Sequence, residues 1–241
     1  MGTRRMSRIM KRDSEIQRSH STGEAGGVPG SGMQDEHAAR SFDEMASGYD
    51  QLVSGSVDFP YEQYSAVLDE VVREAAVQSG MRVLDLGTGT GNLAERFVKC
   101  QCDVWGIDVS EKMLVEARRK LPGVNLIRAD LLGEWPGIDR RFDRVVSSYA
   151  FHHFDLATKV GLLQRIAKEH LMHDGRIVIA DIVFATREDH DRAATRFRPD
   201  WDDSEYYWTA DEAIAELTGL GLHCRYKQVS SCGGVLTVTA G

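Results

Sequence analysis

The sequence predicts an α/β protein: a Rossmann-like, doubly wound sheet of seven strands, mostly parallel, that ends in an antiparallel β-hairpin. Short apolar runs alternate along the chain with segments of helical periodicity, which is the order that builds a parallel sheet. The first run, residues 83–86, is followed by a glycine-rich turn at 87–91 and then by a helical pattern. Two alternating segments at 222–230 and 234–240, joined by a Ser-Cys-Gly-Gly turn, predict the closing hairpin.

The composition is that of a folded domain and narrows the range of functions. Of 241 residues, 42% are hydrophobic and 27% are charged, which are ordinary values for a globular protein with a large core. The net charge of −8 disfavours nucleic acid as a partner, because binding to phosphates requires clustered Lys and Arg. No apolar run approaches the ~20 residues of a bilayer span, so we expect no membrane association and a cytoplasmic location. The four cysteines lack metal-ligand spacing, and we expect no metal site.

Residues 1–33 differ from the rest of the chain. They carry six basic and three acidic side chains, and a glycine-rich run extends from Gly23 to Gly32. Because nothing in them is periodic, we predict a disordered tail and consider Met33 a possible natural start. Residues 34–241 are then expected to form one domain.

Each element of that domain has its own signal. Helical spacing of apolar residues predicts N-terminal cap helices within 34–80, including one at 61–79. The predicted strands after the cap helices are 83–86, 103–108, 125–128, 142–148 and 176–183, with Asp174-Gly175 as the turn before the last of them. Helices are expected after Gly91, after Ser110 as N-cap, at 156–172 and after Thr209 as N-cap. Residues 185–208 hold seven acids, four arginines and several aromatic residues, which suits a segment that covers a substrate.

The glycine turn indicates a ligand site with an unusual acid beside it. Gly87, Gly89 and Gly91 permit backbone angles that other residues avoid, and they let a ligand approach the bare backbone. Asp85 precedes the turn, where its carboxylate would repel the pyrophosphate of a dinucleotide. The pattern therefore favours a ligand without phosphate that carries a positive charge.

This acid-x-Gly-x-Gly-x-Gly stretch resembles the first motif of the class I S-adenosylmethionine (AdoMet) methyltransferases. Residues 34–241 are similar to small bacterial enzymes of the "methyltransferase domain" type, near the ubiquinone/menaquinone-type methyltransferases. The resemblance implies AdoMet as cofactor, S-adenosylhomocysteine as product, and SN2 methyl transfer to a small-molecule acceptor.

Further residues are assigned to the cofactor. Asp108 ends the second predicted strand, where an acid can accept two hydrogen bonds from a ribose diol. The resemblance places Asp130 at the adenine amino group and the backbone of Leu131 at the ring. The predicted cofactor-binding set is Tyr49, Asp85, Gly87, Thr88, Gly89, Gly91, Asp108, Val109, Asp130, Leu131 and Ser147.

The acceptor is expected at the loop 149–154, which follows the fourth predicted strand. His152 and His153 are the candidate catalytic residues, because a histidine can take a proton from an attacking hydroxyl or amine. As neighbours they point in different directions, so one of them at most is expected to face the reacting atoms. Tyr149, His152 and Asp181 are the candidate substrate contacts.

Three alternatives remain open at this stage. An NAD-dependent oxidoreductase shares the glycine turn and the ribose acid, but Asp85 and the terminal hairpin count against it. A non-catalytic AdoMet-binding protein would keep the cofactor residues without turnover. An RNA or protein methyltransferase is disfavoured by the acidic charge and by Ser-Ser-Tyr-Ala at 147–150, where base-amine methyltransferases carry an Asn/Asp-Pro-Pro-aromatic motif. The acceptor atom and the oligomeric state are not predicted.

Overall fold

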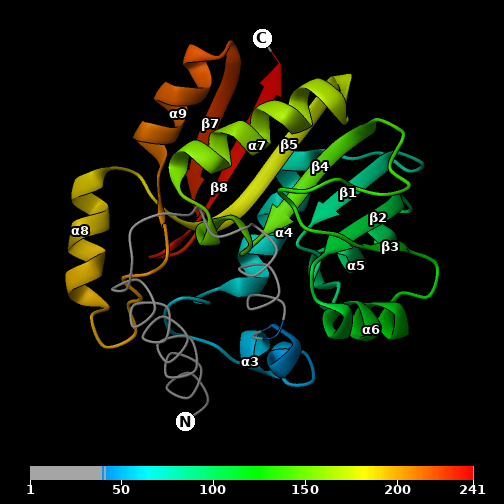
Figure 1. Ribbon diagram of the computed structural model, residues 1–241. Helices are drawn as coiled ribbons and strands as arrows, with labels where there is room; N and C mark the ends of the chain where they lie inside the picture. The colour runs from blue at the N-terminus through cyan, green and yellow to red at the C-terminus, as the bar shows by residue number, and fades with distance from the viewer. Residues whose placement is uncertain (1–39, 41, 241) are drawn as a thin grey trace, which may run out of the picture.

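A mixed β-sheet forms the centre of the computed structural model, which describes residue 40 and residues 42–240 (Figure 1). The predicted tail, 1–33, lies outside the described residues. The strand order is β3-β2-β1-β4-β5-β8-β7. The strands are β1 (Arg82–Leu86), β2 (Asp103–Asp108), β3 (Asn125–Arg128), β4 (Phe142–Ser148), β5 (Leu171–Phe184), β7 (Leu222–Gln228) and β8 (Gly233–Ala240). Strands β1 to β5 are parallel, and β8 is antiparallel to both β5 and β7. The predicted fold class is confirmed, with a two-residue strand β6 (Trp208–Thr209) added beside β5.

Helices cover both faces of this sheet. They are α3 (Tyr49–Ser54), α4 (Tyr64–Ala75), α5 (Asn92–Lys99), α6 (Glu111–Lys120), the 3₁₀ turn η1 (Phe151–His153), α7 (Leu156–Glu169), α8 (Arg187–Arg196) and α9 (Ala210–Gly219). One hydrophobic core joins α7 and α9 to the sheet, and a second joins α4 and α5 to its other face. Figure 1 shows α7 and α4 on these opposite faces. In the part of the chain that the structure describes, no helix combines the length and apolar character of a bilayer span.

The strand order places a ligand site between β1 and β4. From β1 the chain moves outward through β2 and β3, and after β4 it moves the other way through β5. The loops that follow β1 and β4 therefore lie at the point where the strand order reverses, which is where open α/β sheets bind ligands at the carboxyl ends of their strands. The glycine turn follows β1, and the loop with the two histidines follows β4.

The structure corrects several predicted boundaries. Strand β5 begins at Leu171, so Asp174-Gly175 lies inside it and not before it. The pairing explains this, because Leu171 pairs with Phe142 and the register then shifts before Arg176 pairs with Arg144. The residues between act as an irregular bulge, which composition alone does not distinguish from a turn.

Two helix predictions are also adjusted. The helix predicted at 61–79 is shorter, because Gln63 and Ala76, which flank α4, have left-handed backbone angles that end the helix on each side. Thr209 stands at the N-cap of α9 but makes no capping hydrogen bond, since its hydroxyl donates to Glu212 instead. Ser110 caps α6 as predicted, with its Oγ accepting from the Met113 N–H at 3.1 Å.

Candidate functional site

The glycine turn packs directly against the loop that follows β4. Gly87 and Gly89 have φ angles of +67° and +56°, the left-handed region that glycine tolerates without strain. A Cβ on Gly87 would lie 2.5 Å from the Cβ of Ala150, so only glycine allows this contact. Beside Gly89, nothing lies within 4 Å of the position of a Cβ, which leaves room for a ligand against its backbone. The turn thus joins a predicted cofactor surface to the histidine loop.

Asp85 is buried under this turn with half of its carboxylate satisfied. Its Oδ2 accepts a hydrogen bond from Thr88 Oγ1 at 2.8 Å. Its Oδ1 is buried without a partner among the described residues. Burial raises the pKa of Asp85 to about 7. An orphaned acceptor at this place suits a ligand that brings a hydrogen-bond donor or a positive charge.

Asp108 holds the far side of the turn. Its Oδ2 accepts from the Gly89 N–H at 2.8 Å, and its Oδ1 accepts from the Ser110 N–H at 2.9 Å. Burial raises its pKa to about 6. Each carboxylate oxygen has two acceptor positions, so Asp108 retains capacity for the two hydroxyls of a ribose.

The other predicted cofactor residues line the same sheet edge, and some side chains are already engaged. The Val109 carbonyl accepts from Arg128 Nε at 3.1 Å, and Asp130 Oδ1 accepts from the Leu132 N–H at 2.9 Å. Leu131 is buried. The Ser147 hydroxyl donates to the Leu86 carbonyl at 2.7 Å, so its side chain links β4 to β1.

Four tyrosines, Tyr49, Tyr61, Tyr64 and Tyr149, form a cluster. Tyr149 lies with its ring centroid 5.4 Å from that of Tyr61 and 5.3 Å from that of Tyr64, and Tyr49 lies 6.3 Å from Tyr61. Tyr149 has a φ of +53°, an uncommon conformation for a bulky residue, and its buried hydroxyl has no partner among the described residues. Burial raises the pKa of Tyr149 well above its ordinary value, so the phenol stays protonated.

Asp50 ties the N-terminal helices to the glycine turn. Its Oδ1 accepts from Thr90 Oγ1 at 2.6 Å and from Asn92 Nδ2 at 3.0 Å. Its Oδ2 pairs with Lys120 Nζ at 2.7 Å. Asp50 therefore binds residues around the glycine turn. These contacts hold α3, whose first residue is Tyr49, beside the turn.

His152 is fixed by a buried carboxylate. Its Nδ1 lies 2.6 Å from Asp181 Oδ1, and both side chains are almost fully buried. Asp181 also accepts from the Ile182 N–H at 2.8 Å and from Trp208 Nε1 at 3.3 Å. Although burial lowers it, the pKa of His152 lies above its ordinary value because of the Asp181 charge. The predicted substrate residues His152 and Asp181 are thus in direct contact.

His153 pairs with a residue that the sequence did not single out. Its Nδ1 lies 3.0 Å from Glu205 Oε2, and the two residues are 52 positions apart. The residue after Glu205 is held through both of its backbone polar groups. The Tyr206 N–H donates to the His152 carbonyl at 2.8 Å, and Lys159 Nζ donates to the Tyr206 carbonyl. Lys159 is buried, which lowers its pKa to about 8. Glu205 and Lys159 gave no sequence signal, because an acid and a lysine in these segments look like ordinary surface residues.

The two histidine pairs meet in one polar cluster. The ring centroids of His152 and His153 are 4.2 Å apart. The sequence predicted that adjacent histidines point in different directions, but η1 brings both rings to the same place. We call His152, His153, Asp181 and Glu205 the histidine cluster.

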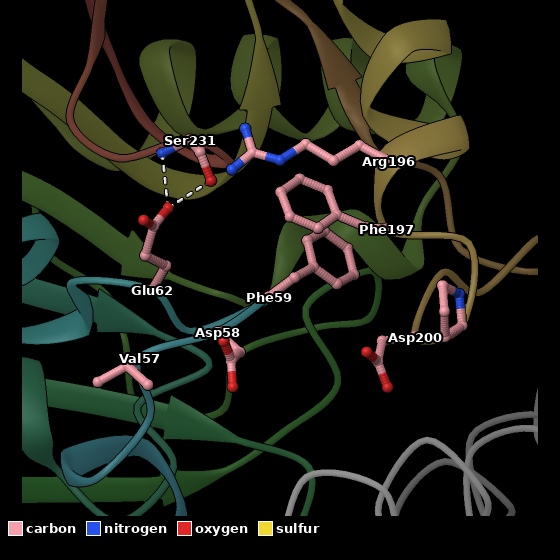
Figure 2. Close-up of a pocket in the computed structure, with 9 residues that line it drawn as sticks. Val57, Asp58, Phe59, Glu62, Arg196, Phe197, Asp200 and Ser231 are labelled. Atoms are coloured by element: carbon pink, nitrogen blue, oxygen red, sulfur yellow. Dashed lines mark hydrogen bonds between the residues drawn. The ribbon is translucent and has the colours of Figure 1, made fainter.

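A surface pocket lies beside the aromatic residues Phe59 and Phe197 (Figure 2). Figure 2 shows the rings of Phe59 and Phe197 facing each other, with Arg196 beside them; the ring centroids are 4.9 Å apart. Phe59 also contacts Tyr207, whose ring lies 6.3 Å from that of His152. The pocket is lined by Val57, Asp58, Phe59, Glu62, Arg196, Phe197, Pro199, Asp200 and Ser231.

Comparison with known sequences agrees with this arrangement. Residues 83–175 match the family model described as "Methyltransferase domain". The methyltransferase YrrT of Bacillus subtilis (strain 168) is 33% identical over 199 residues, which cover 78% of this chain and 90% of YrrT. The family-model match includes the glycine turn, the histidine loop and all of β1 except Arg82.

Solved structures support the fold. Magnesium protoporphyrin IX methyltransferase (ChlM) from Synechocystis PCC 6803 with bound S-adenosylhomocysteine aligns with a TM-score of 0.58 at 18% identity, covering 95% of each chain. The [4+2]-cyclase SpnF aligns with a TM-score of 0.64 at 16% identity, covering 86% of this chain and 97% of its own. The fold alone thus accommodates different reactions. Taken with the sequence relatives and the glycine turn, these findings place the chain in the class I S-adenosylmethionine-dependent methyltransferases.

Proposed function

We propose that this protein transfers the methyl group of AdoMet to a small-molecule acceptor by an SN2 displacement. The observation that carries the proposal is the histidine cluster, in which His152 and Asp181 are buried and which follows Ala150, the residue packed against Gly87 of the glycine turn. A cofactor at the turn and an acceptor at the cluster would then be neighbours.

The residues of the turn fit the cofactor. The buried and unpartnered Oδ1 of Asp85 can face the positive end of AdoMet, and Asp108 can accept from its ribose hydroxyls. The open space beside Gly89 allows contact with the backbone. Asp130 and Leu131 stand at the end of β3, where the family resemblance locates the adenine.

The chemistry requires alignment and the exclusion of water. AdoMet supplies a methyl group on a positively charged sulfur: the acceptor heteroatom forms the new bond to carbon, the S–CH₃ electron pair stays on sulfur as S-adenosylhomocysteine, and the acceptor proton is released. The chain holds the acceptor atom in a fixed position. Holding the two reacting atoms in line accelerates the transfer, because the entropy of bringing them together is lost on binding. The hydrogen bonds of Asp181 and the anchoring of Tyr206 hold the cluster rigid for this purpose.

The surroundings of the cluster favour a small acceptor. Residues 185–208, which we propose as a substrate cap, pack their aromatic residues against the N-terminal part: Trp201 lies with its ring centroid 5.6 Å from that of Phe59, and Tyr207 lies 5.9 Å from it. The His152 side chain is buried next to Tyr207, whereas 27% of the His153 side chain is exposed. A folded RNA or protein surface reaches such an enclosed atom less readily than a small molecule does.

A labelling experiment tests the acceptor class. The protein is incubated with AdoMet carrying a deuterated methyl group and, separately, with small-molecule, RNA and protein fractions of bacterial cells. We expect the label in the small-molecule fraction by mass spectrometry, and its loss with Asp108→Ala. Label in RNA or protein would contradict the small-molecule proposal, and no label in any fraction would favour a non-catalytic AdoMet-binding protein.

The two histidines are expected to matter at saturating acceptor. Because both rings lie at the proposed acceptor position, His152→Ala and His153→Ala should each lower kcat by about 100-fold. His173→Ala is the matched control, because His173 is fully exposed beside Asp174 at the start of β5. Unchanged kcat in both cluster variants would show that neither histidine is a catalytic residue.

A further inference from the structure

The histidine cluster contains three side chains of the types that ligate metals in proteins. Among the described residues, His152, His153 and Glu205 can each offer one ligand atom, and these atoms all lie within 4.8 Å of one another. Two imidazoles and one carboxylate suit a divalent transition metal, and the same set holds catalytic zinc with an open position. We propose that His152, His153 and Glu205 bind a divalent cation of the Zn²⁺ type. The inference deepens the proposed function and rests on it for the role of the cation, but not for its binding.

The surroundings of His152 are those of a metal ligand. A metal-binding histidine usually donates its second ring N–H to a carboxylate, which fixes the ring and its tautomer. Asp181 takes that position here, 2.6 Å from Nδ1, and leaves Nε2 available to a cation. Asp181 is held in turn by the Ile182 N–H and Trp208 Nε1. The support for the ligand thus exists in the structure before any ion binds.

The separations are close to those of a coordination shell. Two ligand atoms of a tetrahedral zinc with bonds of ~2.0–2.1 Å lie ~3.3 Å apart. His153 Nδ1 and Glu205 Oε2 lie 3.0 Å apart, so a small opening of this pair admits an ion between them. The widest separation in the set, at most 4.8 Å, requires a contraction that side-chain rotation can supply.

The local charges also favour a cation. Asp181 and Glu205 bring two negative charges, and the buried Lys159 brings one positive charge at Tyr206 and over the Trp208 ring. Once both imidazoles are neutral, as metal binding requires, the group carries a net negative charge, which a divalent cation would compensate. Glu205 is also tied to the cluster by the Tyr206 N–H, so the carboxylate is held close to both histidines.

The role of such an ion would be to bind the acceptor. Three protein ligands leave a coordination position for a hydroxyl or thiol, whose proton a divalent cation makes easier to remove. The acceptor class is therefore a small molecule with a metal-coordinating hydroxyl or thiol. This differs from the metal-free expectation drawn from the sequence, which had no means of pairing residues 152–153 with Glu205.

Calorimetric titration of Zn²⁺ into the metal-free full-length chain, without AdoMet, tests the binding. We expect one saturable site, at least tenfold weaker in Glu205→Gln and in His153→Ala, and weaker by about 10- to 100-fold in Asp181→Asn. His173→Ala, which removes an exposed imidazole that is also paired with an acid, should bind like the wild type. Circular dichroism checks that each variant is folded, and Glu205→Gln preserves the size of the side chain.

Absence of Zn²⁺ binding, or binding that Glu205→Gln and His153→Ala leave unchanged, would overturn the site. Methyl transfer measured in parallel separates this inference from the proposed function. If the ion binds as described but no acceptor is methylated, the cation site stands and the proposed function fails. If methyl transfer proceeds at full rate in a chelator with no ion bound, the site has no part in catalysis and the inferred role of the ion fails.

Discussion

Asp85 shows how one buried carboxyl couples stability to pH. Its pKa is about 7 in the folded protein against an ordinary value of 3.8, and burial is the main cause. As pH rises from about 4 to about 7, the unfolded chain loses this proton while the folded chain keeps it, so the free energy of unfolding falls. Asp85→Asn removes that loss. Relative to wild type, we expect the variant to gain about 2–3 kcal/mol between pH 5 and pH 7.

Urea denaturation of the cofactor-free protein at the two pH values measures this difference. Asp103→Asn provides the control, because it makes the same change to a carboxylate that is exposed at the start of β2. An equal difference between variant and wild type at both pH values would show that Asp85 is ionised in the folded state.

At the same scale, the sequence predicts backbone requirements better than side-chain partners. The three glycines of the turn adopt positive φ as expected, because glycine is chosen for its own conformational range. The partners of Ser147 and Thr209 could not be predicted. Each depends on which carbonyl or carboxylate a neighbouring element brings within reach, and that is known only after folding.

Among the elements, α7 is linked to the proposed substrate cap through Lys159. The ammonium group donates to the Tyr206 carbonyl and lies 4.5 Å from the centre of the Trp208 ring. Lys159→Met keeps a similar apolar volume but loses both interactions. We therefore expect faster amide hydrogen exchange at residues 206–208 and a lower kcat/KM.

Lys168→Met is the matched control, because Lys168 is on the same helix and exposed. Exchange at residues 206–208 that matches wild type in Lys159→Met would show that other contacts hold this segment. The loss of kcat/KM should then be absent as well.

The periodicity of apolar residues predicted where the helices and strands lie, but it did not predict where each of them begins and ends. The five parallel strands and the hairpin stand where short apolar runs predicted them, because burial on both faces requires such runs. The true start of β5 at Leu171 was missed, since residues 172–174 are exposed and a bulge interrupts the pairing there. The role of 185–208 as a substrate cap stays a prediction.

At the scale of the whole molecule, the fold brings together what the chain separates. Residues from the ends of β4 and β5 and from the segment before β6 meet at one edge of the sheet, and they form the histidine cluster. The doubly wound topology is readable from the order of strands and helices. The pairing of His153 with Glu205 is not, because it depends on how a long connection crosses that edge.

The central claim is that the glycine turn binds AdoMet, and calorimetric titration of AdoMet tests it most directly. We expect one binding site in the wild type, at least tenfold weaker in Asp108→Ala, a loss of about 1.4 kcal/mol or more. Asp103→Ala, at the exposed start of the same strand, should bind like the wild type. Absence of binding to the wild type, or equal affinity in Asp108→Ala, would contradict the assignment of the cofactor to this turn.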